Sequence, residues 1–428
     1  MAGGCWGIRV EDGVDRISEL PVHLREHILD CLNIKDAVST SILSNKWRYC
    51  WTGLRKLVFD EDFWDFDEDL ELVDLLEHVR AIDRVLMLHR GPIREFTLLI
   101  PQIENITVDI NMWLCVLSNN VVQKIEIDAV EYEEPGDNCF PMPSCLFHCR
   151  ELEKLSLHFC KLIRPSDFKG FANLTRLSLN HVDIAPSLLE SLISGCLLLE
   201  TLTLEYLMLK GPFSLETLNL KTFYFNDHSL EFIIFKDNPK LTYVSLLGTT
   251  GQSEFDRTDT PQLYSTLECL CSLSMIKKLT YDFFLLEPLP ENCPSSTPTP
   301  LENLKCLTLR SVDVRLSKDI LFTLCLLRSA PNLQNLTIDL YCDWDLEGLY
   351  KIDKEQGAAE ELLKSEAQKH TSYDSIQTLT ISAIKGLPNE KLLIELLQTR
   401  CPKVKSIVTK RWVWQIDGAF EMNVQAKP

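Results

Sequence analysis

The chain has 428 residues and a formal net charge of −19, and hydrophobic residues make up 45% of it. This length suits two or three domains, or one repeat array with an appendage, and the composition is that of a globular chain with a large core. The acidic balance argues against a general nucleic-acid binder and against an anionic-membrane binder, because both need a basic surface.

No targeting or membrane-spanning segment is expected. The first residues lack the apolar stretch of a secretory signal, and no apolar run approaches the ~20 residues that a membrane span needs. Without a secretory signal, the sixteen cysteines are expected to be reduced and to act as small buried hydrophobic residues. We therefore expect the protein in the nucleus and/or the cytoplasm, with no nucleic-acid or membrane partner.

Residues 1–14 are expected to be disordered, and residues 15–60 to form a helical module. Asp15 or Ser18 can cap its first helix, with Pro21 tolerated in the first turn. Apolar residues fall at helical spacing in this helix, in a second helix over 35–43 and in a third segment. They are Leu24, Ile28, Leu29 and Leu32, then Ala37, Val38, Ile42 and Leu43, then Trp47 and Trp51. About 45 residues bury this surface poorly alone, so part of it is expected to face the repeats or a partner.

Residues 61–90 are expected to form acidic linker helices. Ten acidic residues and no Lys or Arg lie between Asp60 and Glu77, interleaved with apolar residues such as Phe63 and Leu72. The pattern favours a solvated helix face, and an acidic docking strip is the alternative.

One short pattern recurs along the rest of the chain: an aliphatic residue, two variable residues, an aliphatic, one variable residue and an aliphatic. Clear copies begin at Leu152, Leu174, Leu199, Leu215, Leu241, Leu304, Leu333 and Ile376, and weaker ones at Ile93, Val122, Ile276 and Val404. Most copies lie 22 to 30 residues apart, close to the ~20–29 residues of a leucine-rich repeat. The step from Leu199 to Leu215 is only 16 residues, so one boundary there is wrong or the unit is truncated.

The last two aliphatic residues of each copy lie two apart and so share one face of a short strand. Stacked copies predict a solenoid over 91–345, with a parallel sheet on its concave side and helices on its convex side. The residue between these aliphatics is small and polar in most copies, as in Ser156, Asn219 and Thr308, which indicates a scaffold role. The residue that directly follows the last aliphatic residue also faces outward and varies from copy to copy, and we interpret this column of residues as the substrate-binding column. Its members are His158, Asn180, Glu205, Lys221, Leu247, Asp282, Arg310, Asp339 and Ser382.

The C-terminal part, 346–428, is expected to contain a charged helical insert followed by the last repeats. Loops over 248–261 and 288–300 interrupt the array, and the second of them is rich in proline.

A run of motifs near the N-terminus allows a comparison with a known family. Asp-Arg-Ile-Ser-Glu-Leu-Pro starts at Asp15, and Ile28-Leu29, Ala37-Val38, Leu43-Ser44 and Trp47-Arg48 follow. This run resembles the F-box of plant F-box/leucine-rich-repeat proteins. Two pairs, Val22-His23 and Asn45-Lys46, depart from its usual residues without removing an apolar anchor. The stretch 376–410 resembles the FBD domain that often ends such proteins, and two ordinary repeats are the alternative.

The resemblance implies an α/β protein with a three-helix F-box followed by a leucine-rich-repeat solenoid, acting as a non-catalytic adaptor. The F-box would bind a Skp-type adaptor and through it a cullin–RING (SCF-type) ubiquitin ligase, while the repeats would bind an unknown protein substrate. The implied adaptor contacts are Leu20, Pro21, Leu24, Ile28, Leu29, Leu43, Trp47 and Trp51. For each of them, a place in the internal core of the module is the alternative.

No cofactor or metal site is expected. Cys139, Cys145, His148, Cys149 and Cys160 are close in sequence, but they contain no C-x-x-C pair. The chain also lacks the P-loop, dinucleotide-binding, nucleophile-elbow and zincin motifs. The alternatives to a ligase substrate receptor are a scaffold that is not coupled to degradation and an enzyme with a cryptic site.

Overall fold

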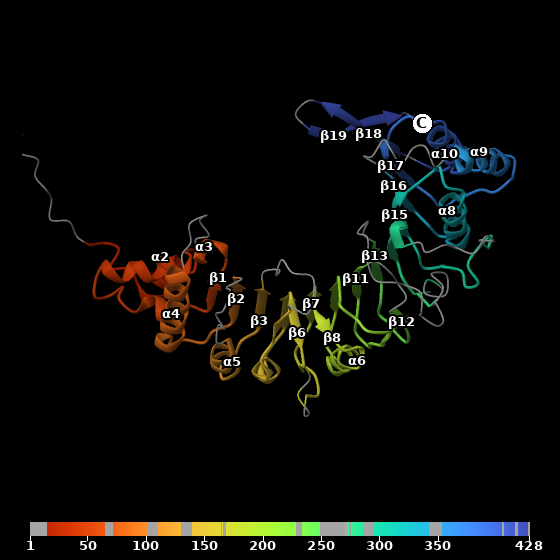
Figure 1. The fold of residues 1–428 in the computed structure, drawn as a ribbon. Coiled ribbons are helices and arrows are strands. Elements are labelled where there is room, and N and C mark those ends of the chain that lie inside the picture. The colour runs from red at the N-terminus through yellow and green to blue at the C-terminus, as the bar shows by residue number, and fades with distance from the viewer. Residues whose placement is uncertain are drawn as a thin grey trace, which may run out of the picture. The chain divides into compact units, whose positions relative to one another are not determined.

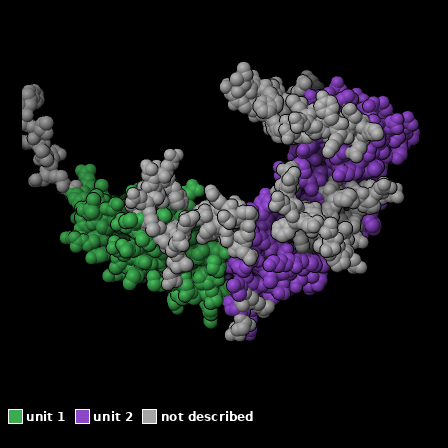
Figure 2. All heavy atoms as spheres, in the orientation of Figure 1, with its two compact units in different colours: residues 1–160 green, residues 161–428 purple. Residues whose placement is uncertain are grey.

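The computed structural model describes residues 15–64, 72–101, 110–129, 139–163, 165, 168–227, 233–248, 270, 272–273, 275–285, 294–341, 353–404, 406–415 and 418–426. The chain divides into two compact units, residues 1–160 and residues 161–428, shown in green and purple in Figure 2. The expected disorder of 1–14, part of the acidic strip and most of the loop over 248–261 lie outside the described residues. Within the described residues, no helix is long and apolar enough to cross a membrane.

The first unit begins with the predicted helical module. Its elements are α1 (Val22–Leu29), α2 (Ile34–Ser39), and the 3-10 helices η1 (Thr40–Ile42) and η2 (Cys50–Gly53). Asn33 caps α2, because its side chain accepts a 2.8 Å hydrogen bond from the backbone N–H of Asp36. Asp15 instead stabilises the turn before α1, where it accepts a 3.0 Å bond from the N–H of Ser18.

The third predicted helix of this module differs from the expectation. Residues 44–53 form tight turns that end in η2. The backbone N–H groups of Trp47, Cys50 and Thr52 bond to the carbonyl three residues back, as Cys50 does to Trp47 at 3.0 Å. Trp47 and Trp51 nevertheless point inward and are buried with Leu29. The module is therefore held together by two α-helices and a compact aromatic turn.

Four parallel strands continue the first unit. They are β1 (Lys56–Phe59), β2 (Glu95–Ile100), β3 (Lys124–Ala129) and β5 (Lys154–His158). Leu57, Phe96, Ile125 and Leu155 stand in register across them. The other elements are α3 (Glu61–Trp64), α4 (Leu72–Leu88), α5 (Ile110–Ser118), β4 (Phe140–Pro141) and η3 (Ser144–His148). β1 is a repeat strand that begins inside the segment predicted as the helical module.

The second unit continues the same repeat. Its parallel strands pair in the order β7 (Arg176–Asn180), β9 (Thr201–Glu205), β11 (Thr222–Asn226), β13 (Tyr243–Leu247), β14 (Lys278–Asp282), β15 (Cys306–Val312), β16 (Asn335–Leu340), β17 (Thr378–Ile384) and β18 (Ser406–Gln415). The sheet ends with β19 (Gly418–Ala426), which is antiparallel to β18. Its shorter elements are β6 (Cys160–Leu162), β8 (Asp183–Ile184), β10 (Phe213–Leu215), β12 (Ile233–Phe235) and η4 (Phe283–Leu285). The large parallel sheet with helices between its strands is that of a leucine-rich-repeat solenoid, as predicted.

Helices cover one side of this sheet. They are α6 (Pro186–Gly195), α8 (Ser317–Ser329), α9 (Asp353–Ala367) and α10 (Pro388–Arg400). In Figure 1, α8, α9 and α10 lie side by side on the outer side of β15, β16 and β17. Glu366 of α9 joins these helices, because it forms an ion pair with Arg328 of α8 at 2.6 Å and one with Arg400 of α10 at 3.5 Å.

The register of β11 corrects one repeat. The sequence pattern placed a copy at Leu215, but that residue lies in β10, outside the large sheet. The strand is instead formed by Phe223 and Phe225, which stand opposite Leu202 and Leu204 of β9. The repeat therefore begins at Leu220, and the irregular steps on either side of Leu215 become two steps of 21 residues. The pattern missed this copy because its inward residues are aromatic rather than aliphatic.

Buried Asp319, in the first turn of α8, makes stability depend on pH. Burial raises the pKa of its carboxyl to about 7, and its Oδ2 accepts a 2.9 Å bond from the N–H of Asp313. Because the folded pKa lies above the value of about 3.9 in an unfolded chain, the contribution to stability is full below about pH 4 and is lost as pH rises through about 7.

Near pH 8 we expect Asp319→Asn to have a higher free energy of unfolding than the native chain, by at most about 4 kcal/mol. The asparagine carbonyl keeps the bond to Asp313 but carries no charge to bury. Thermal unfolding near pH 5 and pH 8 should show a smaller pH dependence in the variant. Equal pH dependence in the two proteins would contradict this account.

Candidate protein-interaction surfaces

The structure separates the eight residues predicted as adaptor contacts into two groups. Leu24, Ile28 and Leu43 are 41%, 41% and 57% exposed, Pro21 is also exposed and Leu20 is half-buried. Leu29, Trp47 and Trp51 are buried in the core of the module. The first group is available to a partner in this conformation, whereas the second supports the fold of the module.

Other large apolar side chains of this module are also exposed. They are Ile17, Val22, Leu32, Ile42 and Tyr49, and Ile42 is 88% exposed. Sequence reasoning did not assign a contact role to them, although Leu32 and Ile42 lie on the predicted apolar stripes. We define the F-box apolar surface as these five side chains together with Leu24, Ile28 and Leu43. So much exposed apolar area on a short module is typical of a protein-binding surface.

Arg25 supports this surface from beneath. Its side chain is buried, and its guanidinium donates hydrogen bonds to the carbonyl of Lys46 and, at 3.4 Å, to the Sγ atom of Cys50. These bonds connect α1 to the turns around Trp47. The bonds therefore fix the position of the exposed residues of α1 relative to those on the turns.

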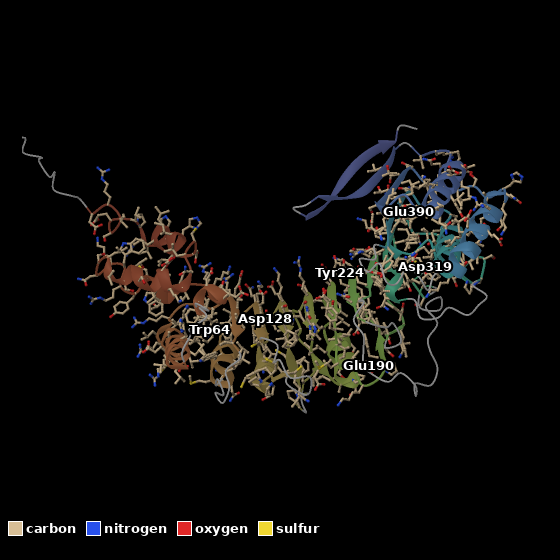
Figure 3. All side chains as sticks on the ribbon, turned by 45° about the horizontal axis from the view of Figure 1, so that its top comes forward. Trp64, Asp128, Glu190, Tyr224, Asp319 and Glu390 are labelled. Atoms are coloured by element: carbon tan, nitrogen blue, oxygen red, sulfur yellow. The ribbon has the colours of Figure 1, made fainter. Side chains whose placement is uncertain are left out.

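The predicted substrate-binding column lies at the carboxyl ends of the parallel strands. In the first unit, Asp128 of β3 stands opposite His158 of β5, and their side chains form a 2.7 Å ion pair when the histidine is protonated. Figure 3 labels Asp128 on this strand end. His158 therefore belongs to the column as predicted, with a neighbour that sequence reasoning did not name.

In the second unit the column continues with Asn180 and Glu205, which stand in register on β7 and β9 and share a 2.9 Å hydrogen bond. The next member is Asn226 of β11, opposite Glu205. The prediction of Lys221 at this place is wrong. Lys221 precedes β11 and forms an ion pair with Glu200 at 2.6 Å. The wrong boundary at Leu215 moved the expected position five residues toward the N-terminus.

The column ends with residues on four adjacent strands. Asp282 and Arg310 are in register on β14 and β15, and the hydroxyl of Ser382 on β17 donates to Asp339 on β16. Burial raises the pKa of Asp282. Arg310 is exposed and lies one strand from each of the two acidic residues, of which Asp282 is buried and Asp339 is half-buried.

The chain turns sharply after several members of the column. The next residue has a positive φ in five repeats, namely Phe159, His181, Tyr206, Ser311 and Ala383. Such a backbone is costly for a residue with a side chain, so the fold must hold it in place. It also brings side chains to the strand ends: the rings of His181 and Tyr206 stack 4.6 Å apart, and the amide of Asn226 donates to the Tyr206 hydroxyl at 3.2 Å.

Tyr224 is a surface residue that sequence reasoning missed. It lies in the middle of β11, opposite Thr203 and Ser245, in a column that elsewhere on the second unit's described parallel strands from β7 to β17 contains Ser or Thr. Its ring is 36% exposed and meets the ring of Tyr243 edge-on, with centroids 5.3 Å apart. In Figure 3 it lies on the opposite side of the sheet from Glu190 of α6. A large aromatic ring on a floor of small side chains is typical of an anchor for a protein partner.

Metal binding finds no support among the described residues, where no three His, Cys, Asp or Glu side chains gather as ligands. Of the cysteines considered at the sequence level, Cys149 and Cys160 are buried in the core, and burial raises the pKa of both thiols.

Two family models match separate segments of the chain. A family model of the F-box domain matches residues 17–59, and a model described as "FBD-associated F-box protein At5g56370, LRR repeats" matches residues 110–338. The second match covers more than half of the 428 residues.

Three relatives from Arabidopsis thaliana show the same combination of domains in their names. F-box/FBD/LRR-repeat protein At1g13570 is 36% identical over 327 residues, which is 76% of this chain and 76% of that protein. F-box/FBD/LRR-repeat protein At5g22700 is 28% identical, covering 78% and 80% of the two chains. Putative F-box/FBD/LRR-repeat protein At5g44950 is 28% identical, covering 65% and 62%. The chain therefore belongs to the plant F-box/FBD/LRR-repeat family.

Proposed function

We propose that this chain is the substrate-recognition subunit of a cullin–RING (SCF-type) E3 ubiquitin ligase and catalyses no step itself. The observation that carries the proposal is the F-box apolar surface, on which Ile42 is 88% and Leu43 57% exposed, within the matched F-box. F-box domains generally bind Skp-type adaptors. A Skp-type adaptor is therefore the partner that suits this surface, and the ligase supplies the chemistry.

The substrate is proposed to bind the outward side chains of the sheet. The half-buried and exposed members of the column between Asn180 and Asp339 offer carboxylates, amides and Arg310, with Tyr224 and Tyr243 beside them. Polar and charged groups of this kind give specificity, while a central aromatic residue supplies much of the affinity. We propose the nucleus and/or the cytoplasm as its location, which imaging of a tagged chain tests.

Co-purification tests the adaptor step. The full chain, co-expressed with a plant Skp-type adaptor, should elute with it in one peak at equal stoichiometry. Separate elution of the two folded proteins would rule out the proposal.

A scaffold that does not promote degradation is the alternative, and it shares the adaptor step. Substrate turnover separates the two. Proteins labelled by proximity to this chain should accumulate when adaptor binding is removed, whereas unchanged turnover of all of them favours the scaffold.

Tyr224→Ser is expected to weaken substrate capture about 5- to 30-fold, because truncating an aromatic anchor costs about 1–2 kcal/mol at an interface. The variant places a serine where the neighbouring strands have Ser or Thr, so the fold should be unaffected. The measurement is quantitative proximity labelling with a chain that also carries changes that abolish adaptor binding, so that substrates are not degraded. Glu361→Gln, on an exposed side of α9, is the matched control. Equal labelling by Tyr224→Ser and the control would exclude Tyr224 from the binding surface.

A further inference from the structure

Two cysteine thiols from different elements of the first unit lie next to each other. The Sγ atoms of Cys115 in α5 and Cys145 in η3 are 2.7 Å apart, although 30 residues separate them in sequence. The thiol of Cys145 also donates to the side-chain carbonyl of Asn111, one turn earlier on α5, at 3.2 Å. Cys145 is thus held against one face of α5 by two contacts.

This pair differs from Cys31, Cys50, Cys149 and Cys160 of the first unit. Cys50 is half-buried, but its Sγ atom contacts the Arg25 guanidinium and the carbonyl of Lys46. Cys149 and Cys160 are fully buried, where a small oxidant does not reach them. Cys31 is exposed, but its thiol faces only its own helix turn, donating to the carbonyl of His27 at 3.4 Å. Cys115 and Cys145 combine partial exposure with a neighbouring thiol. A disulfide is ~2.05 Å long, so a side-chain movement of less than ~1 Å joins these two sulfurs.

We propose that Cys115 and Cys145 are an oxidisable dithiol, which a peroxide converts into a disulfide between α5 and η3. The Cys115 thiolate attacks one oxygen of hydrogen peroxide, the O–O bond breaks, and a sulfenic acid and one water form. The Cys145 sulfur then attacks the sulfenic sulfur and displaces the second water. Two thiols lose two electrons and two protons in total, and one peroxide is reduced to two waters.

The order of attack follows from the different surroundings of the two thiols, since the Cys145 thiol also donates to Asn111. The bond to Cys115, followed by burial, raises the pKa of Cys145 to about 11. Cys145 therefore keeps its proton at neutral pH, where its thiol donates to the side-chain carbonyl of Asn111. Cys115 is the nucleophile toward peroxide, and Cys145 is the resolving thiol.

Peptide mapping of the reduced, full-length chain tests this proposal. After hydrogen peroxide and then N-ethylmaleimide, trypsin releases Cys115 in residues 95–124 and Cys145 in residues 125–150. We expect these peptides to be linked, the whole chain to lose two mass units reversibly with dithiothreitol, and the link to form at least 10-fold faster than the lone Cys31 thiol is oxidised. Because the second peptide also contains Cys139 and Cys149, fragmentation must assign the bond to Cys145.

Variants separate the pair from general cysteine oxidation. Cys31→Ser, the matched control, should leave the link unchanged, and Cys115→Ser should abolish it. Cys115→Ala should also speed alkylation of Cys145, because the side-chain partner that raises its pKa is gone. Links confined to the cysteines of 125–150, or oxidation of Cys31 before any link forms, would overturn the proposal.

Discussion

Truncating Ile28 and Leu43 together is expected to weaken binding of a Skp-type adaptor about 1,000-fold, because each exposed anchor contributes about 2 kcal/mol at an interface. Both side chains are on the surface of the F-box, 41% and 57% exposed. Ile28 lies on α1 and Leu43 directly after η1, so the two changes test two elements of one surface. Isothermal titration of Ile28→Ala, Leu43→Ala and the double variant against purified adaptor measures the effect.

The native fold should survive these changes. Removing exposed apolar atoms leaves no cavity, so we expect the unfolding temperature of the double variant to stay within a few degrees of the native value. Met87→Ala is the matched control, since Met87 is 78% exposed on α4 of the same unit but outside the matched F-box. A double variant that binds the adaptor as tightly as the control would place the adaptor elsewhere.

The same variant separates the two proposed surfaces. The outward column and Tyr224 of the second unit belong to strands of the sheet, and none of those side chains contributes to the F-box apolar surface. Substrate capture by the double variant should therefore equal that of the native chain. Loss of both activities together would indicate unfolding rather than loss of one contact surface.

Sequence periodicity predicted the repeats well, because two inward residues per strand are a local signal. Leu177 and Leu179 show it in β7 and Leu336 and Ile338 in β16, and all four are buried in register with their neighbours. The same rule failed at β11, where Phe223 and Phe225 fill the inward positions. An aromatic residue buries equally well there, so a pattern restricted to aliphatic residues selected Leu215 and with it Lys221.

Surface exposure could not be predicted in the same way. Ile28 and Leu29 are neighbours on α1 with similar side chains, yet one is 41% exposed and the other fully buried. Helical spacing states which residues share a stripe, but the edge of that stripe depends on how α1 packs against the turns around Trp47. The fold of the module therefore decides which apolar residues remain for a partner.

Trp47 provides the second test, in which we expect an unfolded module instead of a lost contact. Its side chain is 1% exposed, and truncating a buried tryptophan costs about 3–5 kcal/mol because it leaves a large cavity. That cost is comparable to the whole stability of a small module, so Trp47→Ala should bind adaptor poorly. Differential scanning calorimetry should show an early transition in this variant.

Measurements at several temperatures distinguish weak adaptor binding caused by unfolding of the module from weak binding caused by a lost contact. Cooling refolds a marginally stable module, so the affinity of Trp47→Ala should recover toward the native value when binding is measured well below its transition. The defect of Ile28→Ala should persist at every temperature, because its missing contact does not return on cooling. Trp47→Phe fills most of the cavity and should bind almost normally. A persistent defect in Trp47→Phe, with native stability, would instead mean that Trp47 leaves the core to contact the adaptor.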